Sequence, residues 1–389
     1  MIRARMAKPS ERLEFRDPER VQAFRQALDR LCRDLPEPIS IMHVCGTHEQ
    51  SIARFGLRSL LPPNLRVIMG PGCPVCVTDM PEVDEAVYLA EQGVILATFG
   101  DMFRVPGTRK SLAEAKAEGA DVRVIYSPWE ALQIARETDR EVVFFATGFE
   151  TTAVATAAVI LSGPPKNFSV LSAHKYIPPV MEIVAEMPQT RVQGFLAAGH
   201  AATITGWKIF ERFVERHGIP VVVAGFEPLD ILSALVQLVE LIRRGEKRVV
   251  NAYPRCVTPE GNRNAQRLLW EVFETESGVW RGIAYVPNGN LRLRRKYAWV
   301  DARARFEIRL SEWLGDAPPR LTQECLCGNI MAGIATPYDC RLFGKECTPE
   351  NPVGACMVSS EGACRIWYEY GGHITGPKGM RELEGTDLT

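Results

Sequence analysis

The C-terminal part of this chain is rich in cysteine and poor in the residues that build a core. Six of the eleven cysteines lie between residue 325 and the C-terminus. The segment 328–364 is interrupted by three prolines and several glycines and shows no regular apolar pattern. A segment that buries so little apolar surface usually needs metal or disulfides to become ordered. We therefore expect a metal cluster in this region, which contains Cys325, Cys327, Cys340, Cys347, Cys356 and Cys364.

The overall composition is that of an ordinary globular protein, with 46% hydrophobic and 24% charged residues. A net charge of −1 gives no basic surface for nucleic acid or for an anionic membrane. No apolar run approaches the ~20 residues of a membrane span, and residues 1–15 lack the apolar stretch of a signal peptide. We therefore expect a cytoplasmic protein, in which clustered thiols indicate metal or redox chemistry rather than structural disulfides.

Short apolar runs alternate with amphipathic segments over the first 250 residues. This alternation predicts an α/β fold with parallel sheets buried on both faces. Eight runs in two sets of four suggest two similar domains facing a cleft, residues 1–127 and 128–250. A third domain of irregular structure, residues 251–389, would hold a helix at 262–273, a hairpin-like stretch and the cysteines. The expected strands are 39–44, 67–69, 94–99, 122–126, 142–146, 168–172, 192–197 and 220–224.

Each expected strand is followed at once by a small, polar or reactive cluster. In open parallel sheets ligands bind outside the carboxyl ends of the strands, so both sets of loops are expected to face one cleft. Any single loop of this kind is more typical of a tight turn. Seven of the eight nevertheless carry a charged or thiol residue. The clusters are CGTHE (45–49), GPGCPVC (70–76), TFGD (98–101), YSP (126–128), TGFETT (147–152), SAHK (172–175), AAGH (197–200) and AGFEP (224–228).

Cys45 ends the first strand and is followed within four residues by His48 and Glu49. Backbone N–H groups at the start of a helix lower the pKa of a thiol, so we expect Cys45 to be a thiolate. A thiolate binds soft metals or attacks electrophiles. The alternative is a half-buried small hydrophobic side chain, which is the commoner fate of a lone cysteine. The neighbouring histidine and glutamate favour the functional interpretation.

Cys73 and Cys76 form a C-x-x-C motif between an expected strand and a helix whose start is marked by Asp79 and Pro81. This position is typical of a dithiol redox pair, and equally of one half of a metal site. No second C-x-x-C at zinc spacing accompanies the motif. The motif alone therefore leaves both possibilities open.

Histidines and glutamates lie at the strand ends of the second set: His174, His200, Glu150 and Glu227. They could be metal ligands, proton carriers or substrate contacts, although a hydrogen-bonded structural role is as common for a single histidine. No phosphate-binding glycine motif follows any strand, so nothing marks a nucleotide site. The candidate catalytic residues are therefore Cys45, His48, Glu49, Cys73, Cys76, Glu150 and His200.

Four of the C-terminal cysteines are spaced C-x14-C-x6-C-x16-C. Four thiolates suit either a 4Fe–4S cluster or tetrahedral zinc, and the spacing does not choose between them. Cys327 and Cys356 could form a dithiol/disulfide pair beside the cluster, or could be spare core thiols. The ligand candidates are Cys325, Cys340, Cys347 and Cys364.

Together these blocks resemble the hydrogenase maturation factor HypD family over essentially the whole chain. Several of the blocks are long and chemically unusual, which speaks against a chance similarity. The matching blocks are CGTHE, GPGCPVCVT, TFGDMFRVPG, VRVIYSP, GFETT, VVVAGFEPLDIL and the tail CLCG…YDCRLFGKECTPENPVGACMVSSEGAC.

The resemblance implies an assembly scaffold with redox activity rather than a classical turnover enzyme. Proteins of this family bind a small partner, HypC, and the complex carries an iron atom that receives two cyanides and one carbon monoxide. The resulting Fe(CN)2CO unit later enters a nickel–iron hydrogenase. Cyanide arrives as thiocyanate on a further maturation protein, HypE, and its release as cyanide needs two electrons.

By similarity, Cys45 would ligate the iron together with a cysteine of the HypC-like partner. Cys73 and Cys76 would form a redox pair near it, and a 4Fe–4S cluster on the four spaced cysteines would supply electrons through Cys327 and Cys356. Cyanide and carbon monoxide demand low-spin ferrous iron and soft thiolate ligands, which agrees with a cysteine ligand. Two rival functions are a general thiol–disulfide oxidoreductase using Cys73 and Cys76, and a non-redox interaction protein stapled by zinc.

Overall fold

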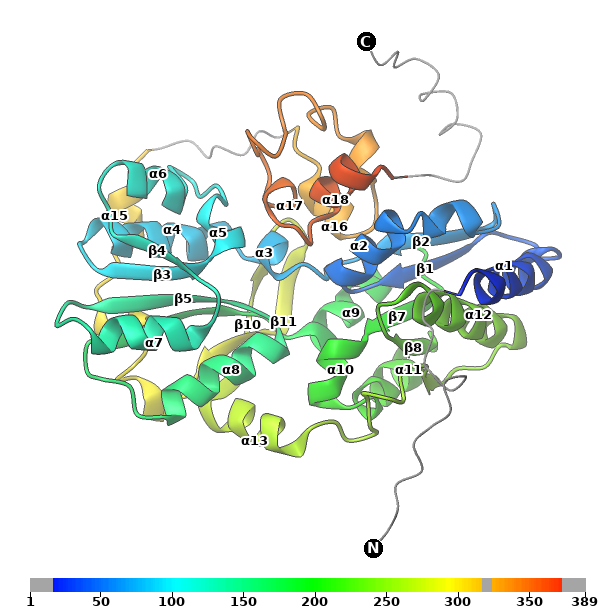
Figure 1. Ribbon diagram of the computed structural model, residues 1–389, viewed down its shortest axis with the longest axis horizontal. Helices are drawn as coiled ribbons and strands as arrows, with labels where there is room; N and C mark the ends of the chain where they lie inside the picture. Colours follow the sequence, from blue (N-terminus) through cyan, green and yellow to red (C-terminus); the bar gives the residue numbers. More distant parts are fainter. Residues whose placement is uncertain (1–16, 317–323, 373–389) are drawn as a thin grey trace, which may run out of the picture.

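Figure 1 shows the computed structural model, which describes residues 17–316 and 324–372. The N-terminal stretch 1–15, which we expected to lack a signal peptide, lies outside the described residues. All eight expected strands are present, so the α/β class predicted from the alternation is confirmed. They are β1 (Ile39–His43), β2 (Leu65–Met69), β3 (Ile95–Phe99), β4 (Val122–Ile125), β5 (Val142–Gly148), β6 (Phe168–His174), β7 (Gly194–Ala198) and β8 (Val221–Ala224).

These strands form two parallel sheets. The first has the order β2-β1-β7-β8-β9 and the second has the order β4-β3-β5-β6. The sequence did not indicate β9 (Val249–Asn251), a three-residue strand at the edge of the first sheet. The chain leaves the first sheet after β2, builds the second sheet from β3 to β6, and returns with β7, which pairs with β1.

The sheets do not follow the expected division into residues 1–127 and 128–250. Strands β3 and β4 belong with β5 and β6, so a boundary after residue 127 would cut the second sheet in half. Strands β1 and β2 are likewise joined to β7, from the later part of the chain. Apolar runs buried on both faces carry no mark of the strand they pair with. Counting the strands in order therefore grouped them wrongly.

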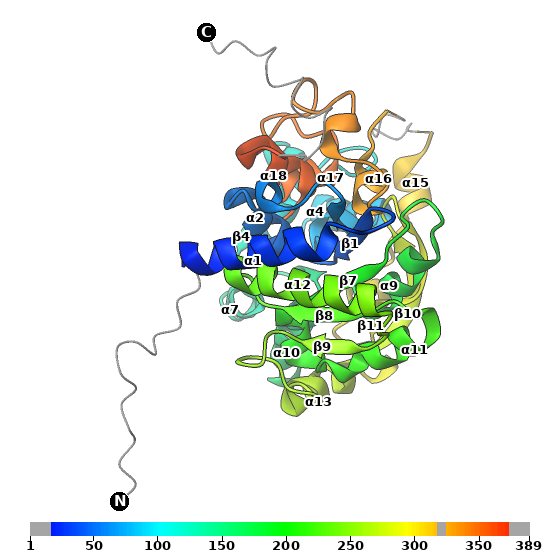
Figure 2. The same ribbon diagram turned by 90° about the vertical axis from the view of Figure 1, so that its right-hand side faces the viewer.

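Helices lie on both faces of the sheets (Figure 1), as buried parallel strands require. The helix start expected at Asp79 and Pro81 is present. Asp79 and Glu82 form a capping box at the start of α4, and Pro81 lies in its first turn. Figure 2 shows α1 and α12 side by side, where their apolar faces share one core. The helices are α1 (Pro18–Cys32), α2 (Gly46–Arg54), α3 (Pro74–Val77), α4 (Met80–Glu91), α5 (Gly100–Phe103), α6 (Leu112–Ala117), α7 (Pro128–Arg136), α8 (Glu150–Leu161), α9 (Ile177–Glu186), α10 (Gly199–Thr205), α11 (Glu211–His217), α12 (Pro228–Arg244), α13 (Arg263–Val272), α14 (Ala302–Arg305), α15 (Leu310–Leu314), α16 (Cys327–Met331), α17 (Ala355–Val358) and α18 (Ala363–Tyr370).

Beyond β9 the chain forms the expected helix, α13, and the expected hairpin. The hairpin pairs β10 (Phe273–Trp280) with β11 (Ala284–Leu293) in antiparallel register. The short helices that carry the C-terminal cysteines follow: α18 packs on α2, and α16 and α17 pack on α3. The cysteine region therefore lies above the place where the two sheets meet (Figure 1).

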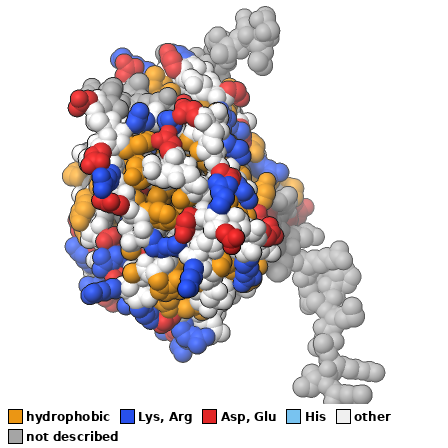
Figure 3. Space-filling model, turned by 90° about the vertical axis from the view of Figure 1, so that its left-hand side faces the viewer, with side chains coloured by type: hydrophobic (Ala, Val, Ile, Leu, Met, Phe, Trp, Pro, Cys, Tyr) orange, Lys and Arg blue, Asp and Glu red, His pale blue; other side chains and the backbone are white. Residues whose placement is uncertain are grey.

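The end of the molecule that holds the second sheet has a mixed surface. Figure 3 shows basic and acidic side chains interspersed there, with hydrophobic side chains gathered in the middle of the face. Two exposed aromatic side chains, Tyr126 and Trp129, follow the edge strand β4. Within residues 17–316 and 324–372, no helix combines the length and the apolar character needed to cross a membrane.

Candidate functional site

The loop that carries Cys45 interlocks with the loop that leads to Cys73. Both loops follow neighbouring parallel strands, β1 and β2, so both leave the same edge of the first sheet. The backbone N–H of Gly46 donates to the carbonyl oxygen of Gly72 over 3.0 Å. A Cβ on Gly72 would lie 2.0 Å from the backbone nitrogen of Cys45, so no larger residue fits there. The C-x-x-C loop and Cys45, singled out separately in the sequence, are therefore parts of one site.

The Cys45 side chain is buried, with 1% of its surface exposed, and it packs against Ala198, Ala201 and Phe226. Burial raises the pKa of the Cys45 thiol to about 12, and the charge of Glu361 adds to the rise. Backbone N–H groups at the start of α2 lower this pKa, as expected, but desolvation outweighs them. The expectation of a free thiolate at neutral pH is therefore wrong, and the sulfur would ionise on binding a metal.

Two neutral histidines lie in this part of the site, and one of them, His200, is next to the thiol. His200 Nδ1 lies 3.9 Å from Cys45 Sγ, and burial lowers the pKa of His200 to about 4. His48 is fully buried, its Nε2 donates to the carbonyl oxygen of Gly225 over 2.9 Å, and burial lowers its pKa to about 3. In the described part of the chain His48 Nδ1 has no hydrogen-bond partner. The Cys45 thiol and the neutral His200 ring are thus two neighbouring side chains of the kinds that bind transition-metal ions.

Glu49 lies at the centre of a buried polar network. Its Oε1 accepts from Arg58 Nη1 at 2.8 Å and from the indole N–H of Trp367 at 2.5 Å. Its Oε2 contacts Arg58 Nη2 at 2.7 Å and His43 Nε2 at 2.8 Å. Burial alone would raise the pKa of Glu49, but the charge of Arg58 and the contact with His43 outweigh it and hold this pKa well below its usual range. Because both oxygens are engaged, Glu49 positions its neighbours, and it joins α2 to α18.

His43 extends this network to the thiol loop. Its second ring nitrogen, Nδ1, lies 3.0 Å from the carbonyl oxygen of Cys45. The ring is fully buried and connects the Cys45 backbone directly to Glu49. A histidine two residues before the cysteine, inside an apolar strand, gave no sequence signal of this role.

A short segment of the C-terminal region, residues 359–361, covers the Cys45 loop. Thr47 Oγ1 donates to Glu361 Oε1 over 3.0 Å, and a Cβ on Gly46 would lie 2.4 Å from the Cβ of Glu361. The hydroxyls of Ser359 and Ser360 donate to Asp101 Oδ2, at 2.9 and 3.2 Å. Asp101 belongs to α5, beside the second sheet. This covering segment therefore contacts both α/β units at once.

Cys73 and Cys76 form a disulfide at the start of α3, and both side chains are fully buried. Because α3 packs against α16 and α17, the disulfide lies next to the helices that carry Cys327 and Cys356. The structure thus brings the dithiol motif close to Cys45 on one side and to the C-terminal cysteines on the other.

The six C-terminal cysteines gather into one group, here called the six-cysteine cluster, in which all but the half-buried Cys325 are buried. Cys356 Sγ lies 3.1 Å from Cys364 Sγ, and Cys327 hydrogen-bonds to Cys356. A Cβ on Gly354 would lie 2.9 Å from Cys325 Sγ, so this backbone passes directly against the sulfurs. The cluster comprises Cys325, Cys327, Cys340, Cys347, Cys356 and Cys364.

The donor set of this cluster fits a 4Fe–4S group. Such a group takes one thiolate per iron, so its four ligands surround a body of several atoms rather than one point. Cys325, Cys340 and Cys347 lie within electrostatic range of one another, and the backbone N–H of Val353 points to Cys347 Sγ over 3.4 Å. Among the described residues no three His, Cys, Asp or Glu side chains lie in a group that could hold a metal ion, so the fit rests on the number and kind of the ligands.

Glu150 and His174 lie at the end of the second sheet. Glu150 is 1% exposed; its Oε1 accepts from the backbone N–H of Ile177 at 3.0 Å, and its Oε2 has no partner in residues 17–316 and 324–372. Burial raises the pKa of Glu150 to about 7, so this carboxyl can hold or release a proton near neutrality. His174 contacts Thr156 Oγ1 at 2.9 Å and the Gly148 carbonyl at 3.4 Å, which is the geometry of a structural histidine.

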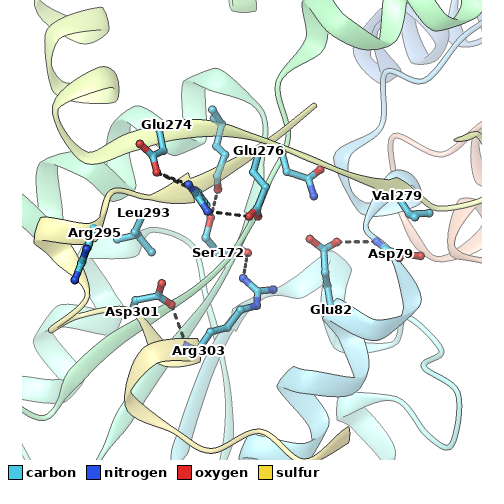
Figure 4. Close-up of a pocket in the computed structure, with 13 residues that line it drawn as sticks. Asp79, Glu82, Ser172, Glu274, Glu276, Val279, Leu293, Arg295, Asp301 and Arg303 are labelled. Atoms are coloured by element: carbon cyan, nitrogen blue, oxygen red, sulfur yellow. Dashed lines mark hydrogen bonds and ion pairs between the residues drawn. The ribbon is translucent and has the colours of Figure 1, made fainter. Parts of the chain in front are cut away.

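The pocket drawn in Figure 4, about 550 Å³ in volume, lies elsewhere. Side chains from the start of α4, from β6, from the hairpin and from α14 line it, and none of the candidate site residues does. Several of its charges are already paired: Arg292 binds Glu274 at 2.8 Å and Glu276 at 3.2 Å within the pocket, and Arg303 binds Glu85, which does not line the pocket, at 2.6 Å. We therefore place the site at the buried thiols rather than in this pocket.

Known proteins match this chain along almost its whole length. The HypD family model, described as the hydrogenase formation hypA family, matches residues 19–371. The chain belongs to the HypD family. It is 44% identical over 372 residues to the hydrogenase maturation factor HypD of Azotobacter vinelandii and 43% identical over 371 residues to that of Cupriavidus necator, in each case 92% of this chain and 96% of the relative. The HypD of Rhodobacter capsulatus is 41% identical over 373 residues, 92% of this chain and 97% of that relative.

Membership of the HypD family confirms the resemblance drawn from the motif blocks. Within this HypD-family fold, the CGTHE and GPGCPVC loops meet and the cysteine tail packs over them. Three residues that the sequence analysis missed join these parts: His43, Arg58 and Glu361. Glu361 lies three residues before Cys364, but no spacing or periodicity indicated that it would reach the Cys45 loop.

Glu150→Gln is expected to flatten the pH dependence of stability above pH 5. A carboxyl whose pKa is raised on folding stabilises the folded chain fully below its unfolded pKa, and this contribution is lost as the pH rises through the folded pKa. For Glu150 the window runs from about 4.3 in the unfolded chain to about 7 in the folded one. In urea unfolding, the free energy of unfolding of the native chain should fall by an amount on the order of 3 kcal/mol across this window. The Gln variant should not show this fall. Equal slopes in both proteins would mean that Glu150 does not titrate there.

Proposed function

We propose that this chain is a scaffold in the maturation of nickel–iron hydrogenase, holding an iron atom at Cys45 while two cyanides and one carbon monoxide are attached. A small HypC-like partner would supply a second cysteine to the iron, and a HypE-like protein would deliver cyanide. The observation that carries this proposal is the buried Cys45 thiol, which lies beside the neutral ring of His200 and whose loop interlocks with the loop of the Cys73–Cys76 disulfide.

The surroundings of Cys45 explain how its thiol could take up iron. A thiol with a pKa of about 12 is protonated at neutral pH, so binding a ferrous ion must release its proton. Glu361 is the carboxyl whose charge acts on Cys45, and burial raises its own pKa, so it is suited to accept that proton. The apolar wall of Ala198, Ala201 and Phe226 excludes water from the loaded thiolate.

The remaining cysteines could supply the electrons that the release of cyanide requires. Breaking the sulfur–carbon bond of a thiocyanate to release cyanide consumes two electrons, and oxidation of one dithiol to a disulfide supplies two. Cys73 and Cys76 are such a pair, and Cys327 and Cys356 lie on the helices packed against them. A 4Fe–4S cluster on Cys325, Cys340, Cys347 and Cys364 would, when bound, deliver electrons one at a time.

A general thiol–disulfide oxidoreductase is the second candidate function, and the disulfide between Cys73 and Cys76 favours it. Both sulfur atoms are fully buried, however, whereas a thiol that attacks protein disulfides needs to be accessible. A zinc-stapled interaction protein remains a third candidate. Metal and sulfide analysis of anaerobically purified chain separates it from the proposal: four irons with sulfide are expected, and one zinc without sulfide would favour the staple.

Infrared spectroscopy tests the scaffold directly. The chain, co-expressed with its HypC-like partner and purified without oxygen, should show stretching bands of two cyanides and one carbon monoxide. The matched control is the same preparation from cells that lack the HypE-like cyanide donor, which should show no cyanide bands. A complex that never shows these bands in cells producing active hydrogenase would contradict the scaffold, and reduction of unrelated protein disulfides by the same preparation would favour the oxidoreductase.

A further inference from the structure

Arg281 is a buried cation held between the disulfide helix and the cysteine tail. It lies in the turn between β10 and β11, and it is 7% exposed. Its backbone N–H donates to the carbonyl oxygen of Val77, the last residue of α3, over 3.0 Å. Its Nη2 donates to the carbonyl oxygen of Pro106 over 3.0 Å. The other terminal nitrogen, Nη1, is buried and has no hydrogen-bond partner in the part of the chain that the structure describes.

The next residue fixes this turn against the tail. Gly282 and Gly328 pack backbone to backbone, and a Cβ on Gly328 would lie 2.2 Å from the carbonyl oxygen of Gly282. Gly282 also has a φ of +72°, a conformation that favours glycine. Gly328 directly follows Cys327, so this contact places Arg281 beside the six-cysteine cluster. Two glycines are thus needed where the hairpin turn meets the CLCG segment.

The charges that act most strongly on Arg281 come mainly from sulfur. They are those of Cys327, Asp79, Cys325 and Cys356, in that order. A guanidinium keeps its charge in proteins, and a buried charge without a counter-charge is strongly destabilising. Asp79 already accepts the backbone N–H of Met80 at the start of α4, and burial raises the pKa of its carboxyl, which weakens it as a counter-ion. Cysteines that bind a metal cluster are deprotonated, so a cluster bound here would supply the counter-charge that the buried guanidinium needs.

We propose that Arg281 is the counter-ion of the six-cysteine cluster, a positioning residue that stabilises negative charge on its sulfur atoms. The inference deepens the proposed function, because it assigns to this chain's own side chain the tuning of the electron relay. Each electron that enters the cluster adds one negative charge, and a fixed cation next to the sulfurs favours that reduced state. Net charge and hydrogen bonds to the sulfur atoms are the factors by which a protein sets the potential of such a centre.

Redox titration of the iron–sulfur absorbance in Arg281→Gln, Arg281→Lys and the native chain tests this proposal. Removing the charge should disfavour reduction about tenfold, which is a fall of about 59 mV in the potential of a one-electron couple. Arg281→Lys keeps the charge and should stay within about threefold of the native equilibrium, or ~30 mV. Arg104→Gln is the matched control: Arg104 donates to the carbonyl oxygens of Pro349 and Glu350 in the tail. It should leave the potential unchanged.

Native potentials in Arg281→Gln, or shifts of equal size in the Gln and Lys variants, would overturn the proposal. Should Arg281→Gln lose its iron and sulfide while Arg281→Lys and Arg104→Gln retain them, the proposal stands, since the charge alone distinguishes the variants. If even the native chain holds no iron and sulfide, the cluster part of the proposed function fails and the inference, which rests on it, is overturned with it. A native chain that holds iron and sulfide, together with unchanged potentials in Arg281→Gln, would overturn the inference alone.

Discussion

A Cys45→Ala variant is expected to abolish delivery of the Fe(CN)2CO unit while leaving the iron–sulfur absorbance of the tail at its native intensity. Alanine removes the sulfur donor beside His200 but retains the packing against the wall formed by Ala198 and Ala201. The six-cysteine cluster does not use Cys45, so its contents should be unaffected. Infrared spectra of the complex with its partner and hydrogenase activity of the host cells measure delivery, and the visible absorbance of the purified chain measures the iron–sulfur content.

Two further variants sharpen this test. Cys45→Ser keeps the size and polarity of the side chain but replaces soft sulfur by oxygen, so it should fail as completely as Cys45→Ala. Cys256→Ala removes an exposed thiol outside the site and should leave delivery intact. Active hydrogenase in cells that carry Cys45→Ala would show that another residue binds the iron, whatever the state of the tail.

The second large effect is expected from Glu49→Gln, which should destabilise the fold by about 3–5 kcal/mol. Glutamine fills the same volume but leaves the buried guanidinium of Arg58 without its counter-charge. It also weakens the hydrogen bond from the Trp367 indole, so α18 should separate from α2 before the rest of the chain unfolds. Urea unfolding gives the loss of stability, and limited proteolysis should cut the tail first.

An exposed ion pair supplies the control for Glu49. Glu182→Gln breaks a contact with Arg216 in which both side chains are partly exposed, and it should cost less than about 1 kcal/mol. The pH dependence adds a second check. Because Glu49 has a lowered pKa in the folded chain, its contribution is complete above the unfolded value of about 4.3 and is lost as the pH falls below it. The difference in unfolding free energy between the native and the Gln protein should therefore become smaller in acid. A difference that does not depend on pH would contradict the buried ion pair.

The strands were predictable from the sequence, and their partners were not. Each run that became β1 to β8 is apolar, short and bounded by turn residues, which is the signature of a buried strand. The sequence does not show whether β3 pairs with β2 or with β5. Both faces of each strand are apolar, and the backbone hydrogen bonds between strands are the same for every partner. For this reason the boundary predicted near residue 127 does not separate the two sheets. The strand β9 was not predicted, because three residues are too few to form a recognisable apolar run.

The candidate site, too, could be predicted from the sequence only in part. Reactive residues after strand ends predicted a common cleft for the loops, and the family resemblance implied that Cys73 and Cys76 lie near Cys45. The two loops do meet, because β1 and β2 are neighbouring parallel strands that end at one edge. The ionisation of Cys45 could not be foreseen, since the helix N-terminus is visible in the sequence but the desolvating wall is not. Contacts such as Thr47 with Glu361, 314 residues apart, and Glu49 with Trp367, 318 apart, follow from tertiary packing alone.

The contacts of Asp101 with Ser359 and Ser360 have a consequence for how the tail is attached. Residues 359–361 are held to α5 beside the second sheet by these serines and to the start of α2, directly after β1, by Glu361, so the tail bridges the two sheets. A change in the relative position of the two sheets would therefore strain this short segment before it strained the sheets themselves.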